Sequence, residues 1–178
     1  MELETARFVL SPLGVDDIDA FVDYRRHPSV AHYQSSTTDY SRADAEQLVA
    51  EQPRTGLPAA GEWLQLAVRR RADGTLLGDV AVGADPVQPQ TFELGVTLMP
   101  SVQGNGYAQE ALAAVRDQLF ASGAHRITMQ GDARNAAVLR LVSRLGFRHE
   151  ASLHDADWFK GEWSSLECFA QLRSEWVP

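Results

Sequence analysis

The sequence of 178 residues predicts one α/β (α+β) domain, in which a central mixed, largely antiparallel, twisted sheet of about seven strands is flanked by about four helices. Three observations predict this fold. Four segments carry apolar residues at helical spacing, and seven short segments have the apolar composition of strands. They follow one another as a strand, two helices, three strands, two helix–strand units and a last strand. No repeat or linker interrupts them, so we expect residues 1–178 to form a single domain.

The helices are indicated by apolar spacing together with capping and stop signals. Between residues 15 and 22 apolar side chains recur at helical spacing, and Pro28 stops this helix. A Ser-x-x-Asp capping pattern opens the second helix, and Gly123 and Gly146 end the third and fourth. The four predicted helices are residues 15–27, 42–51, 108–120 and 135–145.

The strands are indicated by short apolar runs between turn residues. Asp73-Gly74 is a strong tight-turn signal and joins two of these runs into a hairpin. Residues 29–40 and 53–61 lack periodicity and are predicted to be loops, and residues 154–164 are predicted to form a polar loop before the last strand. The seven predicted strands are residues 7–10, 63–68, 76–82, 91–98, 125–129, 147–153 and 165–172.

Charge and composition exclude several classes of function. The chain carries 16 Lys and Arg against 24 Asp and Glu, a net charge of −8, which argues against non-specific binding to nucleic acid or to a membrane. The same balance suits a cationic substrate such as an amine. The single cysteine, Cys168, rules out an intramolecular disulfide, and five scattered histidines lack metal-ligand spacing, so no metal is expected. Without a signal-peptide pattern or an apolar run of membrane length, we expect a cytoplasmic protein, for which a homodimer is a common arrangement.

A glycine-bearing turn, residues 103–108 (Gln-Gly-Asn-Gly-Tyr-Ala), joins the strand at 91–98 to the helix at 108–120. The first N–H groups of a helix lack internal partners and the helix dipole is positive there, so such a turn suits an anion, above all a phosphate. A nucleotide P-loop is excluded because no Lys follows the glycines, and a dinucleotide fold would need a third glycine and an earlier position. A pyrophosphate site of another kind and a plain strand–helix connection both remain.

The turn and four further segments together resemble the GNAT superfamily of N-acetyltransferases, and within it the branch of ribosomal-protein N-terminal acetyltransferases. The turn is similar to the family's Gln/Arg-x-x-Gly-x-Gly/Ala loop for the pyrophosphate of acetyl-CoA, and the likeness extends over about residues 5–176. The other similar segments are Glu93-Leu-Gly-Val-Thr-Leu-Met-Pro100, Glu110-Ala-Leu112, Asn135 with Leu145-Gly-Phe147, and Phe169-Ala-Gln-Leu-Arg-Ser-Glu-Trp176.

This resemblance implies an acetyl-CoA-dependent enzyme that passes an acetyl group by direct attack to a primary amine, either a protein N-terminus or a small molecule. It also implies a GNAT fold with two strands splayed apart at the acetyl-CoA site. The turn would hold the pyrophosphate and the strand before it the pantetheine, while Asn135 would bind pantetheine amides, cap its helix, or both. The expected cofactor-binding residues are Val96, Thr97, Leu98, Gln103, Gly104, Asn105, Gly106, Tyr107, Ala108, Gln109 and Asn135.

For catalysis, the resemblance implies that Glu93 takes the amine proton, with Asp132 as a lesser candidate. The family's general acid is missing, because Val138 and Val142 occupy the positions where Ser or Tyr is usual. Water, or another side chain such as Tyr107 or His149, would then protonate the thiolate. The two valines leave an alternative function open, an acyl-CoA-binding module with little or no transferase activity, and transfer of a longer acyl group also stays open.

The acceptor pocket is expected between the first two helices and the closing hairpin. Aromatic rings and carboxylates there would hold an ammonium group before it loses its proton. The candidates for acceptor binding are Tyr33, Asp155 and Trp158, with Asp157 and Trp163 as further walls. The identity of the acceptor depends on the loops and is not predicted.

Overall fold

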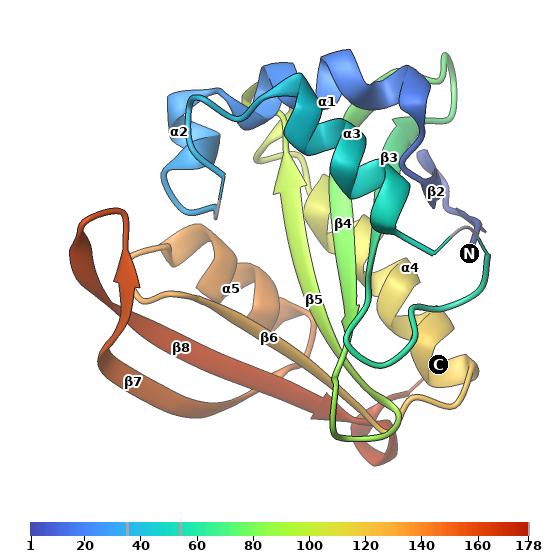
Figure 1. The fold of residues 1–178 in the computed structure, drawn as a ribbon. Coiled ribbons are helices and arrows are strands. Elements are labelled where there is room, and N and C mark those ends of the chain that lie inside the picture. Colours follow the sequence, from blue (N-terminus) through green and yellow to red (C-terminus); the bar gives the residue numbers. More distant parts are fainter. Residues whose placement is uncertain (35, 54, 178) are drawn as a thin grey trace.

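The computed structural model describes residues 1–34, 36–53 and 55–177, and Figure 1 shows their arrangement. In these residues eight strands form one sheet in the order β1-β2-β3-β4-β5-β6-β8-β7. Every neighbouring pair is antiparallel except β5 and β6, which run parallel. The sheet is therefore mixed and largely antiparallel, as the sequence predicts, with one strand more than expected.

The elements follow the predicted order, with one short strand and one short helix added. The strands are β1 (Leu3–Glu4), β2 (Phe8–Pro12), β3 (Trp63–Arg70), β4 (Leu76–Ala84), β5 (Thr91–Leu98), β6 (Arg126–Asp132), β7 (Arg148–Phe159) and β8 (Glu162–Leu172). The α-helices are α1 (Ile18–Arg25), α2 (Pro28–Ala31), α3 (Arg42–Glu51), α4 (Tyr107–Ala121) and α5 (Ala136–Arg144). Within the described residues, no helix combines the length and the hydropathy needed to cross a bilayer.

Helices α4 and α5 cover one face of the sheet (Figure 1). The apolar stripe of α4 includes Leu112 and Val115, which are fully buried in one cluster with Phe92 and Leu94 of β5. Burying a side chain of this size contributes about 1.5–3 kcal/mol. This packing fixes the start of α4, and with it the glycine turn, relative to the end of β5.

Helices α1 and α3 cover the opposite face over β3 and β4 (Figure 1). Beneath α1 lies a buried polar network around Asp79 of β4, which is 1% exposed. Asp79 accepts hydrogen bonds from Tyr24 Oη, from Gln65 Nε2 and, at 2.9 Å, from Arg25 Nη2. Burial raises the pKa of Tyr24 well above its ordinary value, so the phenol stays a donor. Because a buried charge needs its partner, the network holds α1 against β4 and so positions α2, which follows it.

Strands β5 and β6 separate soon after they begin. Their pairing covers only residues 91–93 of β5 and 126–128 of β6, and Glu93 opposite Thr128 is the last pair. Figure 1 shows the two strands diverging beyond this point, with α5 beside the gap. The splayed strand pair that the family resemblance implies is thus present, and it opens the sheet next to the glycine turn.

Two loop predictions are wrong. Residues 28–31, at the start of the predicted loop 29–40, form α2, which His27 caps by accepting a hydrogen bond from Ser29 N; its four residues are too few to show a helical period. Most of the predicted loop 154–164 is strand, since β7 continues to Phe159 and β8 begins at Glu162. Nearly every side chain of β7 is exposed, so the sequence there lacks the apolar alternation that marks a strand.

Candidate active site

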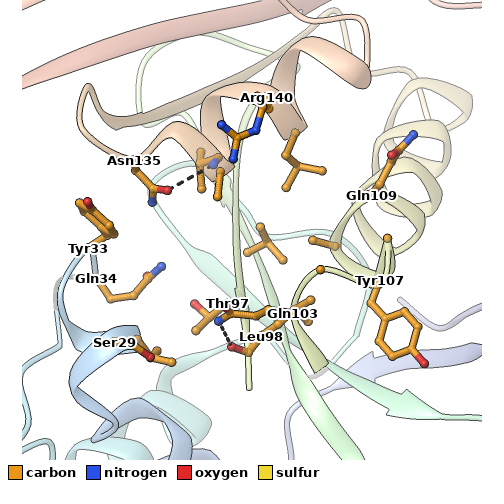
Figure 2. A pocket seen from close by; sticks show the side chains of 18 of the residues that line it. Ser29, Tyr33, Gln34, Thr97, Leu98, Gln103, Tyr107, Gln109, Asn135 and Arg140 are labelled. Carbon is orange, nitrogen blue, oxygen red and sulfur yellow. Dashed lines mark hydrogen bonds between the residues drawn. The ribbon is translucent and has the colours of Figure 1, made fainter. Parts of the chain in front are cut away.

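A cavity of about 430 Å³ lies where β5 and β6 separate, between β5, the start of α4, α5 and the α2 segment (Figure 2). It is lined by the end of β5, by the glycine turn and by one side of α5. All the expected cofactor-binding residues line it except Asn105. Those on its wall are Val96, Thr97, Leu98, Gln103, Gly104, Gly106, Tyr107, Ala108, Gln109 and Asn135.

At two positions the glycine turn has positive φ angles, which cause steric strain in residues other than glycine. Gly104 has φ +80° and Gly106, the N-cap of α4, has φ +74°. Gly106 offers no side chain to cap the helix. The amide N–H groups of residues 104–109 have no hydrogen-bond acceptor within the described ranges. Six consecutive donors at the positive end of a helix dipole form a site suited to a diphosphate.

Arg7, just before β2, holds this turn from the outside. Its Nη1 donates to Asn105 O at 3.1 Å and its Nη2 to Gly106 O at 3.4 Å, while Nε pairs with Glu110 of α4 at 2.5 Å. The guanidinium also lies 4.5 Å from the centre of the Tyr107 ring. Since these carbonyls bond to Arg7, their peptide units are fixed in one orientation. Sequence reasoning missed Arg7, because nothing in the first strand indicates a contact 98 residues away.

Two polar side chains of the turn contact protein rather than pointing to a ligand. Gln103 Nε2 donates to Leu98 O at 2.9 Å (Figure 2), which ties the turn to the end of β5. Asn105 Nδ2 donates to Val102 O and Gln103 O, both at 3.2 Å. These side chains stabilise the loop, and its main chain is left to bind a ligand.

Asn135 caps α5 and also lines the cavity. Its Oδ1 accepts a hydrogen bond from Val138 N at 3.2 Å, as Figure 2 shows. Among the described residues its Nδ2 has no acceptor, so one half of the amide serves the helix and the other can bond to a ligand.

Glu93 lies at the point where β5 and β6 part, and it is not part of the cavity wall. Its Oε1 accepts a hydrogen bond from Gln130 Nε2 at 3.2 Å, and burial raises the pKa of its carboxyl. Asp132 differs, because Arg134 donates to both of its oxygens, at 2.9 and 2.6 Å, and these bonds lower its pKa. A carboxylate held in this way is a poor proton acceptor, so Glu93 is the better base of the two.

The cavity holds no acid at the two valine positions. Val138 is half-buried on the cavity wall, and Val142 is fully buried in the core. Tyr107 does not replace them, since its ring packs edge-on against Phe8 with centroids 5.0 Å apart and points away from the cavity (Figure 2). His149 is not on the cavity wall either, which leaves water as the candidate source of the thiolate proton.

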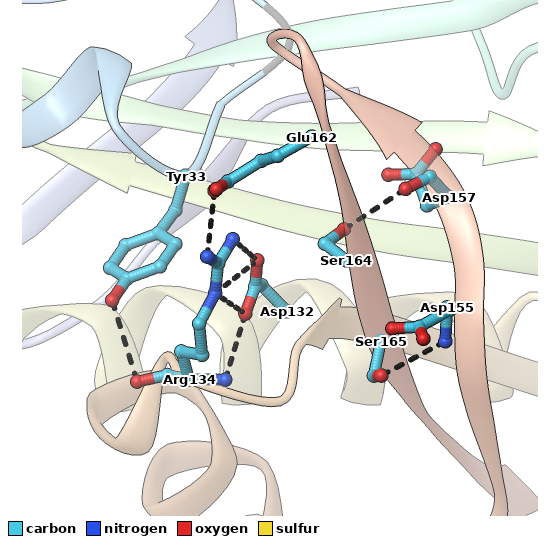
Figure 3. A network of polar contacts seen from close by, with 8 residues as sticks. All are labelled: Tyr33, Asp132, Arg134, Asp155, Asp157, Glu162, Ser164 and Ser165. Carbon is cyan, nitrogen blue, oxygen red and sulfur yellow. Dashed lines mark hydrogen bonds and ion pairs between the residues drawn. The ribbon is translucent and has the colours of Figure 1, made fainter.

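The segment after α2 meets the β7–β8 hairpin through polar contacts (Figure 3). Tyr33 Oη donates to Arg134 O at 3.4 Å, and the Arg134 guanidinium bonds to Glu162 at 2.7 Å as well as to Asp132. Lys160, in the hairpin turn, donates to the carbonyls of Ala31 and Ser36. The structure therefore brings the α2 segment and the hairpin together.

Of the three candidates for acceptor binding, only Tyr33 lines the cavity. Trp158 is 60% exposed and packs edge-on against Trp163, with ring centroids 5.2 Å apart. Asp155 is exposed at a bend in β7, where its N–H donates to Ser165 Oγ at 3.0 Å (Figure 3). Both lie on the outer part of the hairpin because the predicted loop is a strand pair, whose side chains cannot fold back over the cavity.

Comparison with known proteins decides the family. Residues 7–148 match the model of the acetyltransferase (GNAT) domain. The chain belongs to the GNAT acetyltransferase family. It is an N-acetyltransferase, and the enzymes of this family use acetyl-CoA.

Named relatives span the whole length of this GNAT enzyme. An uncharacterized N-acetyltransferase, p20, of Bacillus licheniformis is 25% identical over 98% of both chains. The ribosomal-protein-S5-alanine acetyltransferase of Vibrio fischeri superposes with a TM-score of 0.83 at 18% identity, over 100% of both chains. The spermidine N-acetyltransferase of Vibrio cholerae, solved with CoA and spermine, superposes with a TM-score of 0.82 at 17% identity, over 96% of this chain and 98% of that one. At these identities the two structures show the shared fold.

The site of this GNAT enzyme fits the chemistry of acetyl-CoA. The amide donors at residues 104–109 match a diphosphate, and the open main chain of β5 beside Asn135 offers partners for the pantetheine amides. In the part of the chain that the structure describes, no three His, Cys, Asp or Glu side chains are grouped to hold a metal ion. Acyl transfer to an amine needs none.

Proposed function

We propose that this N-acetyltransferase binds acetyl-CoA in the cavity between β5 and α5 and transfers the acetyl group by direct attack of a primary amine. The observation that carries the proposal is the row of amide N–H groups at residues 104–109, which have no acceptor among the described residues. All of these residues except Asn105 line the cavity at the start of α4. A plain strand–helix connection would not need six donors without partners beside a cavity.

The reaction needs a neutral amine, a polarised carbonyl and a leaving thiolate. The amine nitrogen attacks the thioester carbon, the C–S bond breaks, and the electron pair leaves on sulfur. A main-chain N–H near Leu98 would polarise the carbonyl oxygen. Glu93 would take the amine proton through a water molecule, since it lies at the strand divergence and not on the cavity wall. Water would return a proton to the thiolate, because a thiol pKa of about 8.5 makes it a good leaving group.

We propose that the acceptor is a primary amine on a protein N-terminus or on a small cationic molecule. We also propose that the enzyme belongs to the ribosomal-protein N-terminal acetyltransferase branch. The motifs of the glycine turn and its following helix support the branch, and the likeness to ribosomal-protein and spermidine acetyltransferases supports an amine acceptor. Tyr33 lines the cavity, and Tyr33 and Glu162 both bond to Arg134, so an acceptor that enters past the hairpin would contact these residues. The absence of a bilayer-length helix in the described residues and the use of acetyl-CoA favour a cytoplasmic location.

The test is a free-thiol release assay with acetyl-CoA and a panel of acceptors, which includes peptides with free N-termini, polyamines, amino acids and aminoglycosides. We expect thiol release that depends on one class of amine, and a product that gains one acetyl group by mass spectrometry. Binding of acetyl-CoA without turnover on any acceptor would favour the alternative, an acyl-CoA-binding module, for which Val138 and Val142 are the supporting observation. Faster turnover with a longer acyl-CoA would assign a different donor.

A further inference from the structure

Two arginines of α5 have no partner among the residues that the structure describes. Arg140 and Arg144 line the cavity, and in the described ranges neither donates a hydrogen bond or forms an ion pair. Every other arginine in those ranges bonds to a carboxylate or to a main-chain carbonyl. The chain has 24 acidic against 16 basic residues, so two guanidinium groups on one cavity wall that pair with no described carboxylate point to an anionic ligand.

The two side chains are placed to act together. Arg140 and Arg144 are four residues apart on α5, so they lie on one face of the helix, about 6 Å apart along its axis. Figure 2 shows Arg140 on the α5 wall, between Asn135 and Gln109 in this view. Arg144 lies one helical turn further from Asn135 and lines the same cavity as the glycine turn, so the pair suits the nucleotide part of a donor whose diphosphate lies at that turn.

The glycine turn already provides for one anionic group. Its six amide donors are neutral and suit the diphosphate. An acyl-CoA carries a second anionic group, the ribose 3′-phosphate, a monoester with close to two negative charges at neutral pH. A guanidinium group binds such a phosphate through two parallel hydrogen bonds, which an amide row at a helix start cannot offer.

We propose that Arg140 and Arg144 form a subsite for the 3′-phosphate of the acyl-CoA donor, and that the enzyme uses them to distinguish CoA from dephospho-CoA. The inference rests on the proposed function, since it assumes that acyl-CoA occupies this cavity. It adds a donor-specificity site on α5, separate from the glycine turn, and it accounts for two arginines that have no partner among the described residues.

The test compares the affinity for CoA and for 3′-dephospho-CoA by calorimetry, in the wild-type chain, Arg140→Gln, Arg144→Gln and the double variant. We expect the wild type to prefer CoA by at least about tenfold, and each single variant to lose about three- to tenfold in affinity for CoA with dephospho-CoA unchanged. The double variant should bind the two ligands equally. Arg42→Gln is the control, because it also removes one positive charge. Arg42 lies on α3, does not line the cavity, and pairs with Glu46 at an N–O distance of 2.8 Å.

The outcomes separate the subsite from the proposed function. Equal losses for CoA and dephospho-CoA in the double variant would overturn the subsite, since the arginines would then contact another part of the ligand, and unchanged affinity for both would overturn it as well. A wild-type chain that binds neither ligand would overturn the proposed function and the subsite together. Rising salt should reduce the preference of the wild type for CoA but leave the double variant without one.

Discussion

Replacing Arg7 by Gln should weaken acetyl-CoA binding, although Arg7 lies outside the cavity. In the wild type, Arg7 bonds to the carbonyls of Asn105 and Gly106, pairs with Glu110 and stacks on Tyr107. The change removes the positive charge of Arg7 and the Nε, Nη1 and Nη2 donors of its guanidinium group. The main-chain bond from Arg7 N to Glu110 Oε1, at 3.0 Å, is kept.

The size of the effect follows from these contacts. The Arg7–Glu110 pair is 43% and 21% exposed, so it contributes about 0.5–1 kcal/mol. The partly exposed bonds to the two carbonyls contribute about as much, and so does the cation–π contact with Tyr107. Their sum is about 2 kcal/mol, which would be about thirtyfold in affinity if all of it ordered the turn. Because the main-chain bond to Glu110 persists, we expect a loss of about five- to tenfold.

Calorimetric titration with acetyl-CoA measures this loss, and thiol release should show a raised KM with little change in kcat. Arg71→Gln is the matched control, since Arg71 is another exposed arginine of the same sheet edge, bonded to Thr5 O at 3.2 Å and to Glu4, with no contact to the turn. If Arg7→Gln unfolds more easily yet binds acetyl-CoA as tightly as the control, the residue only stabilises the fold and the reasoning is refuted.

Three further changes test other parts of the site. Glu93→Gln should lower kcat by about a hundredfold without loss of stability at neutral pH, and a fully active variant would exclude Glu93 as the base. Burial raises the pKa of the Glu93 carboxyl, so the activity of the wild type should fall as the pH drops through this pKa and the base becomes protonated. Gly106→Ala should cost about 1–2 kcal/mol at φ +74° and weaken acetyl-CoA binding, whereas Gly14→Ala, at φ −114°, should do neither. Asp79→Asn should lower the free energy of unfolding in urea by about 3–5 kcal/mol, because it leaves the Arg25 charge buried without its partner; a loss below about 1 kcal/mol would contradict this.

The sequence predicts the strand, turn and helix that line the cavity well, because the features that mark them are features of the backbone. The strand at residues 91–98 and the helix at 42–51 have the predicted bounds, and the turn between β5 and α4 adopts the positive φ angles that its glycines allow. A backbone site requires only glycines in the right place and a helix start after them. Both are visible in a linear sequence.

The contacts that complete the site are not visible in this way. Arg7 contacts the turn from 98 residues away in the sequence. The proposed role of Arg140 follows from the observation that the other described arginines have partners, such as Glu110 for Arg7, and the linear sequence does not show these pairs. The acceptor side was predicted less well, since the exposed β7–β8 hairpin lacks the apolar alternation of a buried strand. Its aromatic residues Trp158 and Trp163 therefore looked like pocket walls, but they pack against each other on the surface.

The central claim is that the amide groups of residues 104–109 bind the diphosphate of acetyl-CoA. A titration of the ¹⁵N-labelled chain with CoA, followed by the backbone amide resonances, tests this claim directly. We expect the largest shifts on residues 104–109, with smaller ones on residues 96–98 and on Asn135. Saturable binding that leaves the resonances of residues 104–109 unmoved would contradict it.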